Sequence, residues 1–373
     1  MYESSLRVYH NRTILLSQHF LQPHLSSLSV LFIEEDDDIE VEEIKEVAGG
    51  GESNADEESH LVVKAPKRAE PAPLYPAIQQ FMRAVNSQTP GLEYLGLNTA
   101  ISPQDPSANL ASLAPNHMPH LKTLRLWGEF VLDTNSVLCL ARMPVLQKLE
   151  LSCSAAPFTE YTSSLALPPA AFANLQDIQL MNRSLAFMLS SQIGQHYSQL
   201  RNLEVAFPDA SELCEALNRL SQIPSPLEKI SVTVSRGNVA ARDLLTLRSF
   251  PRLQDLSINT AESLHSDDDT MESVVENLPD LRKIRLSTGW EYAGQDPAPT
   301  LWSIHSLSQH CKLIQSISIN LLARELPHYS PTACEEDSSK VLVWLGGSVF
   351  DDINSVKSWI GLCFGSRPVD YCL

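Results

Sequence analysis

The chain has 373 residues, of which 43% are hydrophobic and 19% charged, and its formal net charge is −18. This composition is typical of a globular protein, and the acidic balance argues against nonspecific nucleic-acid binding, which needs clustered Lys and Arg. No apolar run approaches the ~20 residues of a membrane helix, so we expect no membrane contact. The seven cysteines lack a Cys-x-x-Cys pair and are expected to be reduced, as in a cytoplasmic or nuclear protein.

The N-terminal part combines an apolar segment with a strongly acidic one. Residues 1–33 contain Leu25, Leu28 and Val30 at the spacing Leu-x-x-Leu-x-Leu, which predicts an N-terminal repeat. Residues 34–58 hold thirteen acidic side chains against one lysine. Such a composition cannot bury a core, so we expect residues 34–72 to be a disordered insertion. Its charge could also serve as a docking tail or control access to a binding face.

The Leu-x-x-Leu-x-Leu spacing, with Ile or Val allowed, then recurs along the chain at intervals of 25 to 33 residues. A period of this length is typical of leucine-rich repeats, in which each unit is a short strand followed by a helix. The copies are Leu92/Leu95/Leu97, Leu121/Leu124/Leu126, Leu146/Leu149/Leu151, Leu175/Ile178/Leu180, Leu200/Leu203/Val205, Leu227/Ile230/Val232, Leu253/Leu256/Ile258, Leu281/Ile284/Leu286 and Ile314/Ile317/Ile319, followed by a degenerate Val343/Leu345.

Helical patterns lie between these strand patterns. Asp209–Glu212 resembles a capping box and is followed by leucines at helical spacing. The acidic turn Asp267–Asp269 suits a helix N-terminus, and residues 356–364 carry a last apolar stripe. We therefore predict an α/β fold, a right-handed leucine-rich-repeat solenoid with a parallel sheet on its concave face and helices on its convex face. The irregular repeats are expected over residues 73–366, and residues 367–373 are expected to be a C-terminal tail.

The residues between the repeat leucines should point to the concave face, because successive side chains of a strand alternate between its two sides. Aromatic residues, Arg and Met are frequent anchors of protein interfaces. We expect a protein target to bind at Tyr94, Arg125, Trp127, Glu150, Gln179, Met181, Glu204, Lys283 and Arg285.

Two alternatives stay open for these residues. Trp127 could instead fold back over a neighbouring turn or pack under the acidic insertion. Arg282, Lys283 and Arg285 form a basic patch that could bind an acidic peptide or a phosphate, but a solvated face or pairing with the acidic insertion is the favoured interpretation.

No pattern in the chain indicates an enzyme. His305, His310 and Cys311 lie near one another but match no zinc spacing. Gly49–Gly51 is not followed by the Lys and Ser/Thr of a phosphate-binding loop. We therefore expect no catalytic residue, no metal and no cofactor.

Three stretches resemble the leucine-rich-repeat region of F-box proteins of the divergent fungal type: FLQPHLSSLSV, the recurrent Pro-x-Leu-x-x-Leu-x-Leu, and Val343–Asp351. The resemblance implies the substrate-recognition part of an SCF-type ubiquitin ligase. The F-box itself is missing from the sequence, so Skp and cullin are implied as partners only if the full-length product contains one. The alternative is a stand-alone repeat scaffold without a link to a ligase.

Overall fold

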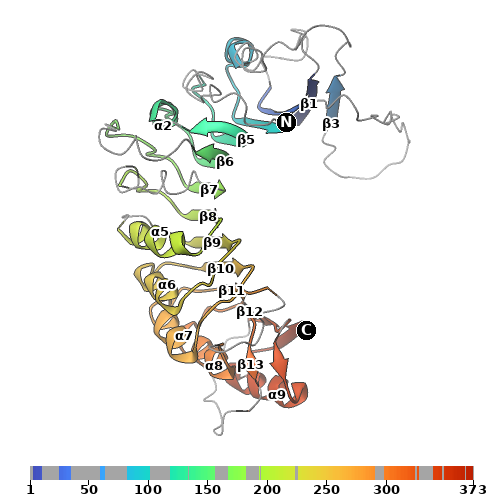
Figure 1. Cartoon of the computed structure of the whole chain (residues 1–373), viewed down its shortest axis with the longest axis vertical. Helices are drawn as coiled ribbons and strands as arrows, with labels where there is room; N and C mark the ends of the chain where they lie inside the picture. Colours follow the sequence, from blue (N-terminus) through green and yellow to red (C-terminus); the bar gives the residue numbers. More distant parts are fainter. Residues whose placement is uncertain are drawn as a thin grey trace, which may run out of the picture. The chain divides into compact units, whose positions relative to one another are not determined.

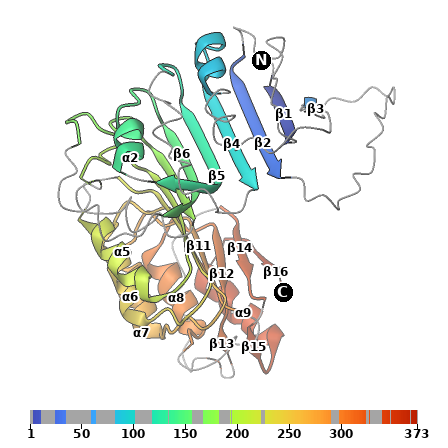
Figure 2. The same cartoon turned by 45° about the horizontal axis from the view of Figure 1, so that its top comes forward.

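The computed structural model describes residues 3–10, 25–34, 59–63, 82–100, 118–132, 134–155, 167–181, 193, 195–222, 226–289, 298–323, 326, 339–346, 348–365 and 367–372. The chain is described below as two compact units, Met1–Leu175 (unit 1) and Gln176–Leu373 (unit 2), whose elements are labelled in Figures 1 and 2.

Unit 1 is a parallel sheet, and two helical segments are described between its strands. Its strands follow the order β3-β1-β2-β4-β5-β6. A helical turn over residues 82–88 precedes β4, and α2 (Thr134–Ala141) connects β5 to β6. The strands are β1 (Glu3–His10), β2 (Ser27–Glu34), β3 (Ser59–Val63), β4 (Tyr94–Ala100), β5 (Thr123–Leu132) and β6 (Lys148–Ala155).

Two strands of unit 1 were not predicted. β1 precedes the first repeat and pairs with both β2 and β3. β3 lies inside residues 34–72, so the expectation of a wholly disordered insertion is wrong at Ser59–Val63. Its sequence Ser-His-Leu-Val-Val is rich in β-formers, and a five-residue strand becomes stable once a neighbour supplies its hydrogen bonds. The remainder of the expected insertion lies outside the described residues.

Unit 2 repeats the same strand-to-helix connection, and Figure 1 shows helices α5 to α8 on one face of its sheet. The strand order is β7-β8-β9-β10-β11-β12-β14-β16, and β13 pairs separately with β15. The strands are β7 (Asp177–Met181), β8 (Asn202–Phe207), β9 (Lys229–Val234), β10 (Asp255–Thr260), β11 (Lys283–Ser287), β12 (Ser316–Ile319), β13 (Leu322–Ala323), β14 (Val341–Trp344), β15 (Val349–Phe350) and β16 (Val369–Cys372). The helices are α5 (Ser211–Ser221), α6 (Ala241–Leu245), η4 (Thr246–Ser249), α7 (Asp268–Val275), α8 (Leu301–His310) and α9 (Ile353–Phe364).

The repeat leucines form the core between sheet and helices. Equivalent positions lie side by side on adjacent strands, as in Leu95, Leu124 and Leu149, and all three are at most 1% exposed. The strand pattern alternates buried and accessible residues in β7 and β10. The predicted α/β repeat fold with a parallel sheet is confirmed. The side of each sheet that carries the residues between these leucines is called the open face below.

Helices α5 and α7 begin where the sequence predicted them, but one of the two predicted caps does not form. Asp267 caps α7 through a hydrogen bond from Thr270 N of 2.8 Å. The capping box expected at Asp209–Glu212 does not form, because the carboxylate of Asp209 accepts a hydrogen bond from Ser211 N, 2.8 Å away. α5 nevertheless begins at Ser211 and buries the predicted leucines.

The C-terminal segment is part of the fold. Residues 367–373 were expected to be a tail, but Val369–Cys372 form β16 and pair in register with β14. The segment alternates in exposure along β16 and follows the buried Arg367. A four-residue strand is too short for its hydrophobic pattern to predict it.

Candidate functional site

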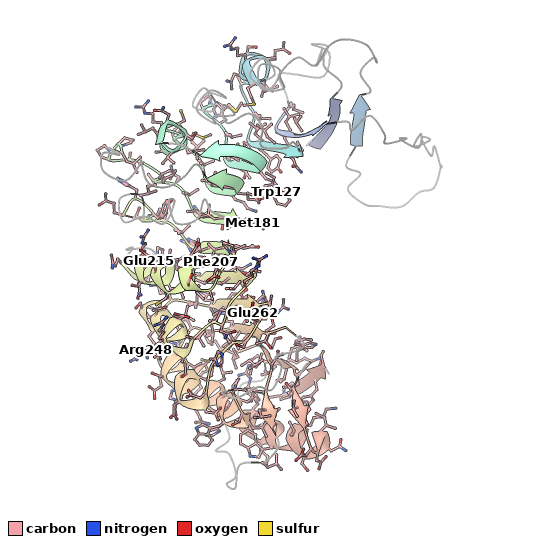
Figure 3. The ribbon with its side chains drawn as sticks, viewed as in Figure 1. Trp127, Met181, Phe207, Glu215, Arg248 and Glu262 are labelled. Carbon is pink, nitrogen blue, oxygen red and sulfur yellow. The ribbon has the colours of Figure 1, made fainter. Side chains whose placement is uncertain are left out.

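The open face of unit 1 brings four of the predicted residues together. β4, β5 and β6 are adjacent, and their register places Arg125 between Gly96 and Glu150. Trp127 follows Arg125 on the same side of β5 and is shown in Figure 3. Tyr94 and Glu150 complete the group on the flanking strands. We call Tyr94, Arg125, Trp127, Lys148 and Glu150 the β4–β6 cluster.

Arg125 is fixed by two neighbours in this cluster. Its guanidinium carbon lies 3.6 Å from the ring centre of Trp127, a cation–π stack. Its Nε lies 3.3 Å from Oε2 of Glu150, while Nζ of Lys148 lies 2.7 Å from Oε1 of the same carboxylate. Glu150 is only 8% exposed, so one nearly buried carboxylate orients two cations whose side chains remain accessible. Lys148 was not among the predicted site residues.

A glycine makes room for Tyr94. A Cβ atom at Gly96 would lie 3.0 Å from the Tyr94 hydroxyl oxygen and 3.1 Å from Oγ of Ser29. The phenol ring therefore lies across the β4 backbone next to the position of Arg125. The sequence pattern placed Gly96 on this face but could not show that its missing side chain admits the ring.

The predicted residues of unit 2 lie on its open face in two separate places. The side chain of Gln179 donates a hydrogen bond of 3.2 Å to Glu204, and Met181 follows on the same side of β7. Lys283 and Arg285 lie on β11, with β9 and β10 between them and β8. Strands are about 4.8 Å apart, so the structure does not join these two groups into one cluster.

The β11 residues form an accessible basic patch. Lys283 and Arg285 are both exposed, and the register places Arg285 between Ser257 and Ser318. Neither cation forms an ion pair with another residue in the described part of the chain.

A group of possible metal ligands on the helices was missed by the sequence analysis. Glu272, Glu276 and His310 offer ligand atoms that all lie within 4.8 Å of one another. The i, i+4 spacing of the two glutamates was visible in the sequence. The histidine, however, comes from the next repeat, and no local spacing could place it there.

Five cysteines in the described part of the chain form no disulfide bond: Cys139, Cys214, Cys311, Cys363 and Cys372. Burial raises the pKa of Cys311 to about 12, so its thiol is protonated at neutral pH and donates a hydrogen bond of 3.5 Å to the carbonyl oxygen of Leu278. Cys372 on β16 is exposed.

No family model and no curated protein sequence matches the chain. A chain in the crystal structure of the Rad7 and Elc1 complex in yeast is similar in structure, with a TM-score of 0.42 and 14% identity, over 79% of this chain and 72% of that one. Within the described residues, no helix has the length and apolar character to span a membrane. The assignment of a repeat fold rests on the strands and helices themselves.

Proposed function

We propose that this protein is a binding scaffold that holds a protein partner on the open face of unit 1. The observation that carries the proposal is the β4–β6 cluster, in which Arg125 is stacked on Trp127 and held by Glu150 while staying accessible. Arg, Trp and Tyr are the residue types that dominate binding energy in protein interfaces. They occur here together on the two adjacent strands β4 and β5.

The rigidity of the cluster supports this role. Binding costs free energy when mobile side chains must be ordered, roughly 0.5–1.5 kcal/mol for each long side chain. Arg125 is already ordered by its stack and ion pair, so little of that cost remains. Two cations share one carboxylate in the cluster, which leaves a net positive charge beside two aromatic rings. A partner that offers a carboxylate or carbonyl group next to an apolar side chain fits this arrangement.

The finer proposal is that the scaffold is the substrate-recognition part of an SCF-type ubiquitin ligase. It is supported by the resemblance of the repeat openings and of Val343–Asp351 to F-box leucine-rich-repeat proteins. In that role the open face holds the target, and an F-box in the full-length product contacts the Skp adaptor. The alternative is a scaffold that binds its partner without a ligase.

The first experiment is affinity capture of partners by the tagged chain, compared with the double variant Arg125→Ala/Trp127→Ala. We expect partners captured by the wild type to be lost from the double variant. The matched control is Arg248→Ala, because Arg248 is an exposed arginine of η4 on the helix side of unit 2. Partners retained equally by the wild type and both variants contradict the placement of the binding face.

The same assay examines the residues predicted in unit 2. The variants Lys283→Ala/Arg285→Ala and Gln179→Ala/Met181→Ala show whether a partner also contacts that open face. A separate capture from cells that express the full-length product distinguishes ligase from scaffold. Skp and cullin should co-purify in the first case, and their absence alongside a retained target contradicts the ligase proposal.

A further inference from the structure

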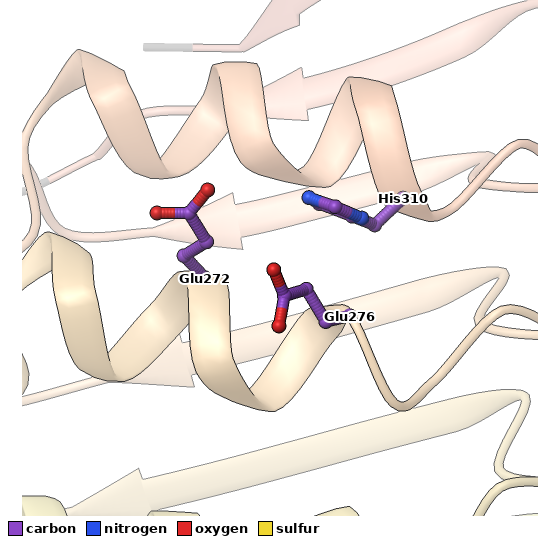
Figure 4. Close-up of side chains that lie close together, drawn as sticks. All are labelled: Glu272, Glu276 and His310. Atoms are coloured by element: carbon purple, nitrogen blue, oxygen red, sulfur yellow. The ribbon is translucent and has the colours of Figure 1, made fainter.

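We propose that Glu272, Glu276 and His310 form a binding site for a divalent transition-metal ion, with Zn²⁺ as the ion that best fits the ligands. Figure 4 shows the two carboxylates rising from one helix toward the next helix, where the imidazole of His310 points to them. Glu272 lies in α7, Glu276 caps its C-terminus, and His310 is the last residue of α8. The site joins two successive repeats on the side opposite the open face.

The spacing of the ligands suits a single ion after a small adjustment. The three ligand atoms lie within 4.8 Å of one another. Bonds to Zn²⁺ of about 2.0–2.2 Å place neighbouring ligand atoms roughly 3.5 Å apart in a tetrahedral site. Glu276 is exposed and Glu272 and His310 are half-buried, so their side chains have room to move inward by about 1 Å.

In the described part of the chain, no ion pair or side-chain hydrogen bond involves Glu272, Glu276 or His310. The charges of Glu272 and His310 also act on His305 of α8. Two carboxylates four residues apart on a helix repel each other by roughly 0.2–0.5 kcal/mol. A cation between them removes this repulsion, and the imidazole adds a third ligand from a different element. On an ordinary acidic surface, nothing would bring a histidine from the next helix close to the two carboxylates.

The ligand set indicates the class of metal. One imidazole nitrogen with two carboxylate oxygens is typical of Zn²⁺ and neighbouring transition metals, whereas Mg²⁺ and Ca²⁺ prefer oxygen ligands alone. Three protein ligands leave one position of a tetrahedral ion for water. A bound ion would cross-link α7 to α8 and stabilise the folded chain in proportion to its occupancy.

The experiment is calorimetric titration of Zn²⁺ into the chelator-treated full chain at pH 7.5. All proteins carry the Cys372→Ser substitution, because Cys372 is an exposed thiol that could bind the metal by itself. We expect one Zn²⁺ per chain and an affinity at least tenfold lower for both Glu276→Gln and His310→Gln. The matched control Glu212→Gln removes an exposed carboxylate from α5 and should leave the affinity unchanged.

Two further measurements keep the proposal open to refutation. Zn²⁺ should raise the midpoint of thermal unfolding of the parent protein but not of His310→Gln, and Mg²⁺ should leave it unchanged. Binding should weaken as the pH is lowered, because protons compete with a metal ion for its ligands. The proposal is overturned if no saturable binding occurs, or if Glu276→Gln and His310→Gln bind as tightly as the parent. Because the site lies away from the open face, either result leaves the proposed partner binding untouched.

Discussion

Arg367 is 5% exposed, and its guanidinium lies among backbone carbonyl groups of earlier segments. It donates hydrogen bonds to the carbonyl oxygens of Ser339 at 3.1 Å, Lys312 at 3.2 Å and Ile314, and to the Ser339 hydroxyl oxygen. Its planar group of donors satisfies several acceptors at once. This residue shows why the last segment is not a tail, and why sequence could not reveal it, since the partners lie 28 to 55 residues away.

Replacement of this side chain should loosen the end of unit 2. In Arg367→Met the buried carbonyl groups lose their donors, at about 1–3 kcal/mol for each unsatisfied group, and we expect a net loss of about 3 kcal/mol. Native-state hydrogen exchange of the β14 and β16 amides measures this local stability. The control is Arg242→Met, because the Arg242 side chain is 81% exposed. Equal protection in both variants contradicts the role of Arg367.

Two residues of the Val343–Asp351 motif also have a structural explanation. A Cβ atom at Gly346 would lie 2.4 Å from Cζ2 of Trp344, so the glycine gives space to the indole ring. The Ser348 hydroxyl accepts a hydrogen bond of 2.9 Å from the amide of Leu321 in the preceding repeat. These two residues of the motif therefore help to pack the last repeats together.

At the scale of elements, the acidic turn before α7 serves two helices. The sequence predicted that its charges would suit a helix N-terminus, and Asp267 caps α7 as expected. Asp268 instead reaches the start of α8. It accepts hydrogen bonds from the amide and hydroxyl groups of Thr300 at 2.9 and 2.6 Å and from those of Ser303 at 3.1 and 2.6 Å. One carboxylate therefore connects two repeats.

Loss of that carboxylate should destabilise α8 more than α7. We expect Asp268→Ala to lower the local stability of α8 by about 2 kcal/mol, in line with the cost of losing a helix cap and charged hydrogen bonds. Hydrogen exchange of the α8 amides checks the size and place of the effect. Asp269→Ala is the matched control, because Asp269 is exposed in the same turn. A loss of the same size in the control, or an effect confined to α7, argues against the link.

Because Asp267 caps α7, the stability of the folded protein should decrease at low pH. Hydrogen bonds from the hydroxyl and amide of Thr270 lower the pKa of the Asp267 carboxyl below its usual range. The folded state therefore holds this proton less tightly than the unfolded state. The stabilisation is complete above the unfolded pKa of about 3.9 and is lost as the pH falls through the lower folded pKa.

The variant Asp267→Asn tests this linkage, since asparagine can still cap the helix but does not titrate. We expect the wild type to have the higher midpoint of thermal unfolding at pH 6, with the difference shrinking as the pH approaches 3. Asp269→Asn, an exposed residue of the same turn, should not reproduce this convergence. A constant difference between pH 6 and pH 3 would show that the carboxylate charge does not contribute.

For the whole molecule, repetition in the sequence was enough to predict the strands of the repeats and the side of the sheet that their leucines occupy. Each buried leucine triplet is local, so its spacing reports the strand directly. β1, β3 and β16 could not be predicted, because short strands become stable only through neighbours distant in sequence.

For the candidate site, the sequence predicted which residues share a face of the sheet but not the contacts between their side chains. Alternation along β5 placed Arg125 and Trp127 on one face, and the register confirms their neighbours. The pattern could not show that Arg125 stacks on Trp127 or that Lys148 shares Glu150. Those facts depend on side-chain conformations, which repeat spacing does not determine. Nor could it align α7 with α8, so Glu276 and His310 stayed apart in the sequence analysis.

The central claim, that the β4–β6 cluster holds a protein partner, is tested most directly by calorimetry with a partner recovered by affinity capture. We predict that Trp127→Ala raises the dissociation constant at least tenfold, about 1.4 kcal/mol of binding free energy, while Arg248→Ala leaves it unchanged. Circular dichroism of each variant confirms that its fold is intact. The opposite result, unchanged affinity for Trp127→Ala together with weaker binding for Arg248→Ala, would place the interface on the helix side and contradict this account.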